Sequence, residues 1–192
     1  MKILVNITRS AVIEVIMEIY NYAPSFEGRP EKEIRTYKLL AELGIEFERI
    51  EHEAAKTIAD CAEVDRAFGT PMCKNLLLCN ASKNKIYMLM MPGKKAFDTK
   101  ELRNQIGSSR LSFAPGEYME SLLDITPGSL TVLGLANDKE HNVKLIIDKD
   151  VIDADYICCH PAVNTASLKI RTDDILNVFL KHTGHDPIIV NL

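Results

Sequence analysis

The chain has 192 residues, with 23 lysines and arginines against 27 aspartates and glutamates, a net charge of −4. Apolar residues make up 46% and charged residues 26% of the sequence, the balance of an ordinary globular protein with a sizeable core. The distribution of apolar residues excludes a membrane-spanning protein, because no apolar run approaches the roughly 20 residues that a transmembrane helix needs. It also argues against a general nucleic-acid-binding protein, whose surface would be basic.

Cysteine use points to a reducing compartment. The chain has five cysteines, an odd number, and no Cys-x-x-Cys pair, which fits neither a disulfide framework nor a zinc site. We therefore expect a cytoplasmic protein that needs no metal and no other cofactor. The adjacent Cys158 and Cys159 are followed by His160, so a thiol-dependent enzyme stays open as an alternative to two buried core residues.

A segment rich in proline, glycine and serine divides the chain. It spans residues 21–30 and separates an N-terminal extension, residues 1–28, from a main domain, residues 29–192. The first element of the main domain is a helix over residues 31–43, in which apolar side chains recur at helical spacing and which Gly44 ends.

The next elements alternate between strands and helices. A strand is expected over residues 45–52. Residues 57–60 then resemble a capping box, with aspartate in the acidic place, and open a helix that ends at Gly69. Two apolar runs, residues 73–79 and 85–91, are joined by a polar turn and predict an antiparallel hairpin.

The second half of the chain carries the same mixture of elements. Helices are expected from Asp98 to Gly107 and from Pro115 to about Leu123, and Thr172 is placed to cap the last helix. Because a hairpin pairs antiparallel and helices interrupt the strands irregularly, we predict an α/β fold with a mixed, largely antiparallel sheet and surrounding helices. The further strands are predicted over residues 143–147, 156–159, 168–170 and 188–190.

Positive charge is concentrated in one segment of the chain. Residues 83–110 carry seven basic and two acidic side chains, a local charge of +5 that leaves −9 for the remainder. Such a basic strip on an acidic body can bind a polyanion at one face while the rest of the surface repels it. The alternative is an ordinary solvated helix and hairpin surface.

Three short segments carry polar residues where a core or a plain turn does not require them. Lys74 and Asn75 lie within the first apolar run of the hairpin, where a lysine must reach solvent, pair with an anion or lose its proton. Residues 127–134 form a tight loop whose backbone N–H groups could hold an oxyanion, and residues 160–167 follow a predicted strand. Each also has a purely structural interpretation: a lysine at a strand end, an ordinary turn and a hydrogen-bonded histidine.

Taken together, in this order and spacing, three segments resemble the YbaK/ProX family of prolyl-tRNA editing domains: residues 74–78, 128–135 and 160–167. The resemblance covers residues 31–190 and is closer to the ProX branch, which removes alanine, than to the YbaK branch, which removes cysteine. One position departs from the family pattern, because Val132 stands where the family loop usually carries a proline.

The resemblance implies a trans-editing hydrolase that releases alanine from mischarged alanyl-tRNA(Pro) without a cofactor. Lys74 would anchor the substrate's carbonyl or ribose-phosphate, and backbone N–H groups around Gly128 would hold the ester oxygen as it becomes negative. His160 would limit the size of the amino-acid pocket, because a pocket too small for proline spares the correct product. The residues that orient the substrate would be Asn75, Ser129, Asn164 and Thr165.

The partner implied by the resemblance is the acceptor end of tRNA(Pro), with prolyl-tRNA synthetase as a second candidate and a monomer or homodimer as the assembly. Two alternatives stay open: a cysteinyl-tRNA(Pro) deacylase of YbaK type, and a catalytically silent module that binds tRNA ends or the synthetase. The phosphates of the acceptor stem would meet the basic strip, through Lys94, Lys95, Lys100, Arg103 and Arg110.

Overall fold

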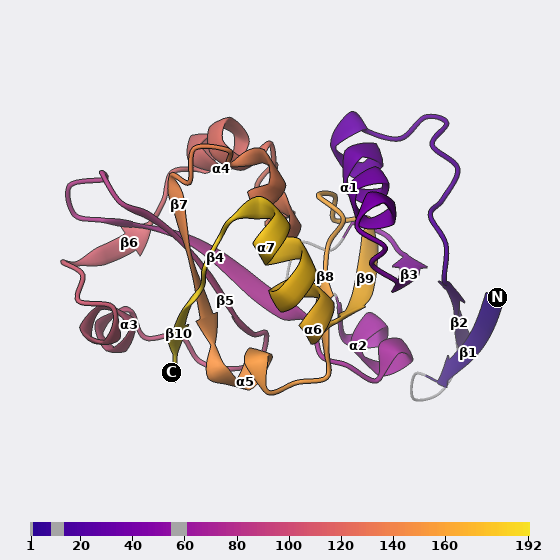
Figure 1. Ribbon diagram of the computed structural model, residues 1–192. Coiled ribbons are helices and arrows are strands. Elements are labelled where there is room, and N and C mark those ends of the chain that lie inside the picture. The colour runs from indigo at the N-terminus through magenta and orange to yellow at the C-terminus, as the bar shows by residue number, and fades with distance from the viewer. Residues whose placement is uncertain (1, 9–13, 55–60) are drawn as a thin grey trace.

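Two five-stranded sheets form the framework of the protein, with helices packed around them (Figure 1). The structure, a computed structural model, describes residues 2–8, 14–54 and 61–192. The strand orders are β1-β2-β3-β9-β8 and β10-β7-β5-β4-β6. The strands are β1 (Lys2–Thr8), β2 (Glu14–Tyr20), β3 (Phe47–Glu51), β4 (Cys73–Asn80), β5 (Ile86–Pro92), β6 (Leu111–Phe113), β7 (Val143–Asp148), β8 (Tyr156–Cys159), β9 (Ala166–Arg171) and β10 (Ile188–Val190).

The helical segments lie between these strands. No helix within the described ranges is long and apolar enough to cross a membrane. The segments are α1 (Glu31–Glu42), α2 (Ala62–Phe68), α3 (Thr99–Gln105), α4 (Gly116–Leu123), the 3₁₀ helix η2 (Val132–Asn137), α5 (Lys149–Ile152), α6 (Thr172–Asp174), the π-helical η3 (Ile175–Phe179) and α7 (Leu180–Thr183).

The predicted fold class is confirmed. Antiparallel pairing joins β3 to β9 and β4 to β5, whereas β7 pairs in parallel with β5 and β10. The predicted hairpin is β4–β5, in which Leu77 lies opposite Met88. The predicted first helix is α1, where acidic residues in the first turn suit the helix dipole and Tyr37 and Leu40 are buried. Among the described strands, the first sheet is therefore antiparallel and the second is mixed.

One predicted helix cap is wrong, and another lies outside the described residues. Arg171, not Thr172, holds the extended cap position, because β9 runs directly into the last helix. Thr172 is the first helical residue, and its buried hydroxyl has no hydrogen-bond partner among the residues described. The capping box predicted at residues 57–60 lies outside the described ranges, while α2 ends at Gly69 in the left-handed conformation, as expected.

The N-terminal extension contains a hairpin. Strands β1 and β2 pair with each other, and Tyr20 of β2 pairs with Arg49 of β3, so the hairpin extends the first sheet. Figure 1 places this hairpin at the opposite end of the molecule from α3 and β6. A domain boundary at residue 28 stays a prediction.

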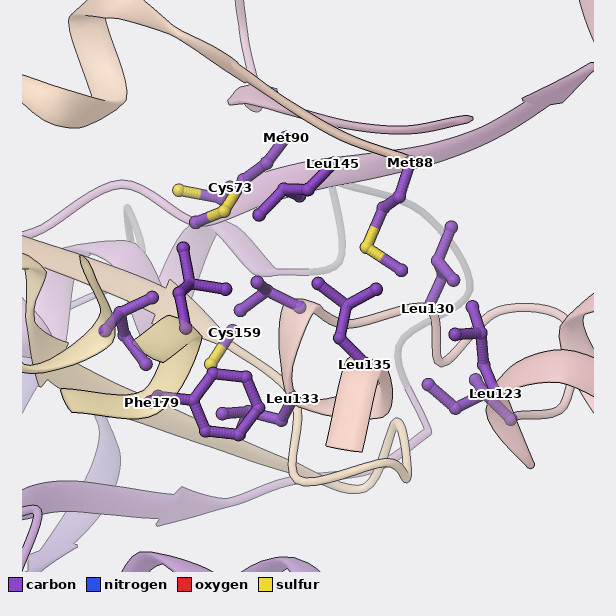
Figure 2. Packing of buried hydrophobic residues seen from close by; sticks show 14 of the residues in the cluster. Cys73, Met88, Met90, Leu123, Leu130, Leu133, Leu135, Leu145, Cys159 and Phe179 are labelled. Atoms are coloured by element: carbon purple, nitrogen blue, oxygen red, sulfur yellow. The ribbon is translucent and has the colours of Figure 1, made fainter. Parts of the chain in front are cut away.

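The second sheet separates two cores. Because successive strand residues point to opposite faces, Leu77 enters the main core, which both sheets share, whereas Leu78 enters a smaller core with Leu102 of α3. Figure 2 shows the main core, where Leu133 and other residues of the 128–135 segment pack with side chains of β5 and β7. The 128–135 segment and α3 therefore lie on opposite faces of the second sheet.

Candidate active site

A tight turn after α4 brings Gly128 against a distant part of the chain. The Ser129 amide donates to the Thr126 carbonyl across 3.1 Å and closes the turn. Gly128 has a φ of +91°, which glycine adopts without strain. A β-carbon placed on Gly128 would lie 3.7 Å from Nδ2 of Asn164. The two polar segments singled out in the sequence, residues 127–134 and 160–167, therefore meet at this contact.

Strand β4 contributes Asn75 to the same place. Its Nδ2 donates to the Leu130 carbonyl across 3.2 Å, two residues after Gly128. Its Oδ1 is buried, and no hydrogen bond from the described residues reaches it. A buried acceptor without a partner is costly, so this oxygen is suited to accept a donor from a bound substrate.

Thr131 fixes the loop next to Val132, the position at which the family usually carries a proline. Thr131 is fully buried and caps η2 by accepting the Leu133 amide across 3.4 Å. Its hydroxyl also forms a hydrogen bond with the thiol of Cys159 at the end of β8. Val132 follows as the first residue of η2, a position at which helices tolerate proline. The loop is thus tied to β8 without the proline ring.

His160 lies at the end of β8 and presents one ring nitrogen as an acceptor. Its Nδ1 donates to the Ala166 carbonyl across 2.9 Å, and since a carbonyl only accepts, Nδ1 carries the proton of the neutral ring. Burial, with a smaller contribution from His52, lowers the pKa of His160. The neutral imidazole therefore keeps a lone pair on Nε2 that can accept a hydrogen bond.

His52 is a site residue that the sequence analysis did not single out. Its amide donates to the Thr165 carbonyl across 3.0 Å, and its Nε2 lies 2.8 Å from the hydroxyl of Ser167. The rings of His52 and His160 are 6.2 Å apart. The sequence signal that could have identified His52 was its position at the end of a predicted strand, because the loops that follow strands often carry functional residues. These two contacts of His52 hold the 160–167 segment in place. Thr165, which supplies its carbonyl to one of them, is exposed.

The side chain of Lys74 extends from the face of β4 opposite to that of Asn75. It lies opposite Met91, a residue of the α3 core, whereas Asn75 lies opposite Met90 of the main core. Its ammonium donates to the carbonyl of Lys95, and burial lowers the pKa of Lys74. The contacts of the described residues thus bring Asn75, Gly128 and Asn164 together, but they do not bring the Lys74 ammonium to Gly128.

The predicted basic strip divides into two groups. The ammonium of Lys95 lies 2.9 Å from Oδ1 of Asp148, which is fully buried, and 2.7 Å from Oδ2 of Asp150. These ion pairs hold the Lys95 ammonium against two carboxylates, so Lys95 is not the open phosphate contact that was expected from the sequence. The remaining four residues are at least partly exposed. Lys100 and Arg103 lie in α3 and Arg110 just before β6, whereas Lys94 follows β5 and acts electrostatically on Asp65 of α2.

Comparison with known proteins connects this geometry to a family. The sequence profile of the aminoacyl-tRNA editing domain matches residues 52–178, more than half of the chain. The chain belongs to the aminoacyl-tRNA editing domain family. The match begins at His52 and contains the Gly128 turn and the 160–167 segment. The editing domain is therefore an aminoacyl-tRNA deacylase.

Comparison with individual proteins finds relatives whose names refer to prolyl-tRNA. The prolyl-tRNA editing protein ProX of Acetoanaerobium sticklandii is 29% identical over 136 residues, which cover 71% of this chain and 83% of that protein. The prolyl-tRNA synthetase associated domain-containing protein 1 of Bos taurus is 30% identical over 156 residues, 79% of this chain and 90% of that protein. A crystal structure provisionally described as a trans-editing enzyme for prolyl-tRNA synthetase superposes with a TM-score of 0.63 at 18% identity, covering 86% and 98% of the two chains. This last likeness shows the fold.

The adjacent cysteines of β8 are core residues. Cys158 and Cys159 are fully buried, and burial raises the pKa of both thiols, that of Cys159 to about 12. A protonated and inaccessible thiol is a poor nucleophile. Figure 2 shows Cys159 and Cys73 surrounded by apolar side chains of the main core. The structure therefore favours two buried core residues over the thiol-dependent alternative.

The site of the editing domain is suited to ester hydrolysis by positioning. In the part of the chain that the structure describes, no hydrogen bond engages the Gly128 amide, and no group of three or more His, Cys, Asp or Glu residues is arranged to hold a metal. The turn offers an amide donor, Asn75 an unpaired acceptor and His160 a neutral imidazole. An aminoacyl ester needs no strong nucleophile when water and ester are held in place.

Proposed function

We propose that this editing domain hydrolyses mischarged alanyl-tRNA(Pro). The observation that carries the proposal is the contact of the Gly128 turn with Asn164, completed by Asn75 from β4. It places an open amide donor beside polar side chains from two other segments of the chain. The names of the relatives support prolyl-tRNA as the class of substrate, and the resemblance to the ProX branch favours alanine.

The proposed selectivity follows from size. A synthetase pocket that accepts proline also admits alanine, because a cavity excludes larger side chains more easily than smaller ones. A second pocket that is too small for proline then removes the error. His160 is the proposed wall of this pocket, and the contacts of His52 with Thr165 and Ser167 hold the segment that carries it.

The proposed chemistry assigns one role to each group. The Gly128 amide stabilises the ester oxygen as it becomes negative, an interaction worth roughly 3–4 kcal/mol in other hydrolases. Oδ1 of Asn75 accepts from the substrate's ammonium or ribose hydroxyl, and Ser129, Asn164 and Thr165 shape the surrounding loops. Water is the nucleophile, and its proton leaves with the ribose oxygen. Lys74, next to Asn75 in β4, takes no part in this proposed chemistry, because its ammonium lies on the other face of the sheet and donates to the Lys95 carbonyl.

A deacylation panel tests this proposal. Wild-type protein is given tRNA(Pro) charged with alanine, cysteine, serine or proline, and release of each amino acid is followed over time. We expect alanine to be released fastest and proline to be spared. Preferential release of cysteine would establish the YbaK-type alternative, and tight tRNA binding without any hydrolysis would establish the silent module.

A glycine pair supplies the matched variants for the panel. Gly128→Ala forces a strained φ and places a methyl group against Asn164, so we expect alanine release to fall at least about tenfold. Gly107→Ala is the control, since Gly107 has a φ of +62° with nothing within 4 Å of the added carbon. Equal activity of both variants would remove Gly128 from the mechanism.

A further inference from the structure

We propose that the cavity between α1 and η2 binds a backbone phosphate of the tRNA acceptor strand; this rests on the proposed function. The cavity measures about 250 Å³. Lys32 and Arg35 of α1 line it from one side and Lys139, just after η2, lines it from the other. Its apolar wall includes Leu133 and Phe179 of the main core.

The charge of this cavity is opposite to that of the whole chain. Three of its lining side chains are cationic, and among the described residues that line it none is acidic. The complete chain has a net charge of −4. Arg35 also contacts Asp124, but both side chains are about half exposed, and such surface pairs are weak and leave guanidinium donors available. A local positive cavity on an acidic protein attracts an anion to one place.

The cavity is connected to the candidate active site. Nζ of Lys32 donates to Oγ1 of Thr126 across 3.3 Å, and the carbonyl of Thr126 accepts the Ser129 amide that closes the Gly128 turn. Leu133 belongs to the same segment as Gly128 and to the same main core. An anion in the cavity therefore lies on the face of the second sheet that carries the turn, whereas α3 lies on the other face.

Size and chemistry favour a phosphodiester as the occupant. Pockets that enclose drug-sized ligands usually measure about 300–1,000 Å³, so this cavity fits a phosphate with part of a sugar better than a larger molecule. Arginine and lysine are the usual phosphate ligands in proteins. The aminoacyl end of the proposed substrate lies at Gly128, so its neighbouring strand supplies phosphates close by.

The test compares two double variants of the full chain that change the net charge equally. Arg35→Gln with Lys139→Gln removes cations from the cavity, and Lys100→Gln with Arg103→Gln removes the same charge from α3. Lys32 is left intact because it contacts the turn. Binding of uncharged tRNA(Pro) is measured over a range of salt concentrations, and KM and kcat are measured for alanyl-tRNA(Pro). Thermal unfolding verifies that each variant is folded.

We expect the cavity variant to raise KM about tenfold with little change in kcat. Each lost phosphate contact should also reduce the slope of log affinity against log salt by about 0.7–0.9. Wild-type affinity and slope in the cavity variant would overturn the inference, as would an equal or larger loss in the α3 variant. Competition by millimolar inorganic phosphate that is lost in the cavity variant, with unchanged tRNA affinity, would assign the cavity to free phosphate and also overturn it.

Failure of this inference can be told apart from failure of the proposed function. The binding measurement uses uncharged tRNA and does not depend on hydrolysis. If alanine is released but the cavity variant binds tRNA normally, the proposed function stands and the phosphate site is wrong. If no ester is hydrolysed but tRNA binding depends on the cavity cations, the phosphate site stands and the proposed function is wrong.

Discussion

His160 combines a fixed tautomer with a buried ring. The bond from Nδ1 to the Ala166 carbonyl decides which nitrogen carries the proton, and burial keeps the ring neutral by lowering its pKa. The nearby His52 ring adds to this effect, because two adjacent imidazolium ions repel each other. At the scale of single residues, hydrogen bonds to backbone carbonyls thus position Asn75, His160 and His52.

The lowered pKa of His160 predicts how stability depends on pH. As the pH falls through the ordinary histidine value of 6.5, the unfolded chain takes up the proton before the folded chain does, so stability is lost below that value and is complete above it. We expect His160→Gln to lose less stability than the wild type between about pH 7 and about pH 5. Urea unfolding at several pH values measures this, and identical pH profiles would contradict it.

The 3₁₀ helix η2 supports the Gly128 turn from behind. It buries Val132, Leu133 and Leu135 in the main core, and Gly134 lies so close to Ile125 that a β-carbon would overlap Cδ1 of that side chain. At the scale of elements, the turn is therefore positioned by close packing of η2 against the segment that follows α4.

Gly134→Ala should destabilise the fold. The added methyl group forces Ile125 to move within a packed core, which costs roughly 1–3 kcal/mol. Adding Ile125→Val deletes the overlapping methyl group, so the double variant should lose less than the sum of the single variants. Chemical unfolding of the three variants measures the coupling, and Ser121→Ala in exposed α4 is the control. Strict additivity would refute the packing argument.

Lys95 and Asp148 connect parts of the molecule that are distant in sequence. The Lys95 carbonyl accepts from Lys74 of β4, while its ammonium pairs with Asp148 at the end of β7. Asp148 is fully buried and also accepts the amides of Asp150 and Leu192, across 2.9 Å and 3.2 Å. At the scale of the whole molecule, this cluster joins β4, the turn after β5 and Leu192 to the end of β7.

Lys95→Ala should lower the stability of the whole protein. It leaves the buried Asp148 carboxylate without its counter-ion, and since Lys95 is partly exposed we expect a loss of roughly 1–3 kcal/mol rather than the full cost of a buried pair. Lys94→Ala is the matched control, because Lys94 is exposed and should change stability by less than about 0.5 kcal/mol. Comparable unfolding midpoints for the two variants would show that the cluster is not structural.

The sequence by itself determined the local elements and the residue types of the site. The hairpin β4–β5 and helix α1 follow from apolar spacing and from turn and helix signals within a few residues, so they were predictable without the fold. The polar segments around Gly128 and His160 were found in the same way, as residues that a core or a turn does not need. Their order and spacing also indicated the family that the profile match then established.

Tertiary structure alone decided which of these residues meet. The contact of Gly128 with Asn164, the exit of Lys74 through the opposite face and the pairing of Lys95 with Asp148 all join segments that are distant in sequence or depend on strand register. The cavity between α1 and η2 is likewise formed by segments that are distant in sequence. Local propensity carries no information about these contacts, because they form only when two sheets pack against a shared core and fix which face each side chain takes.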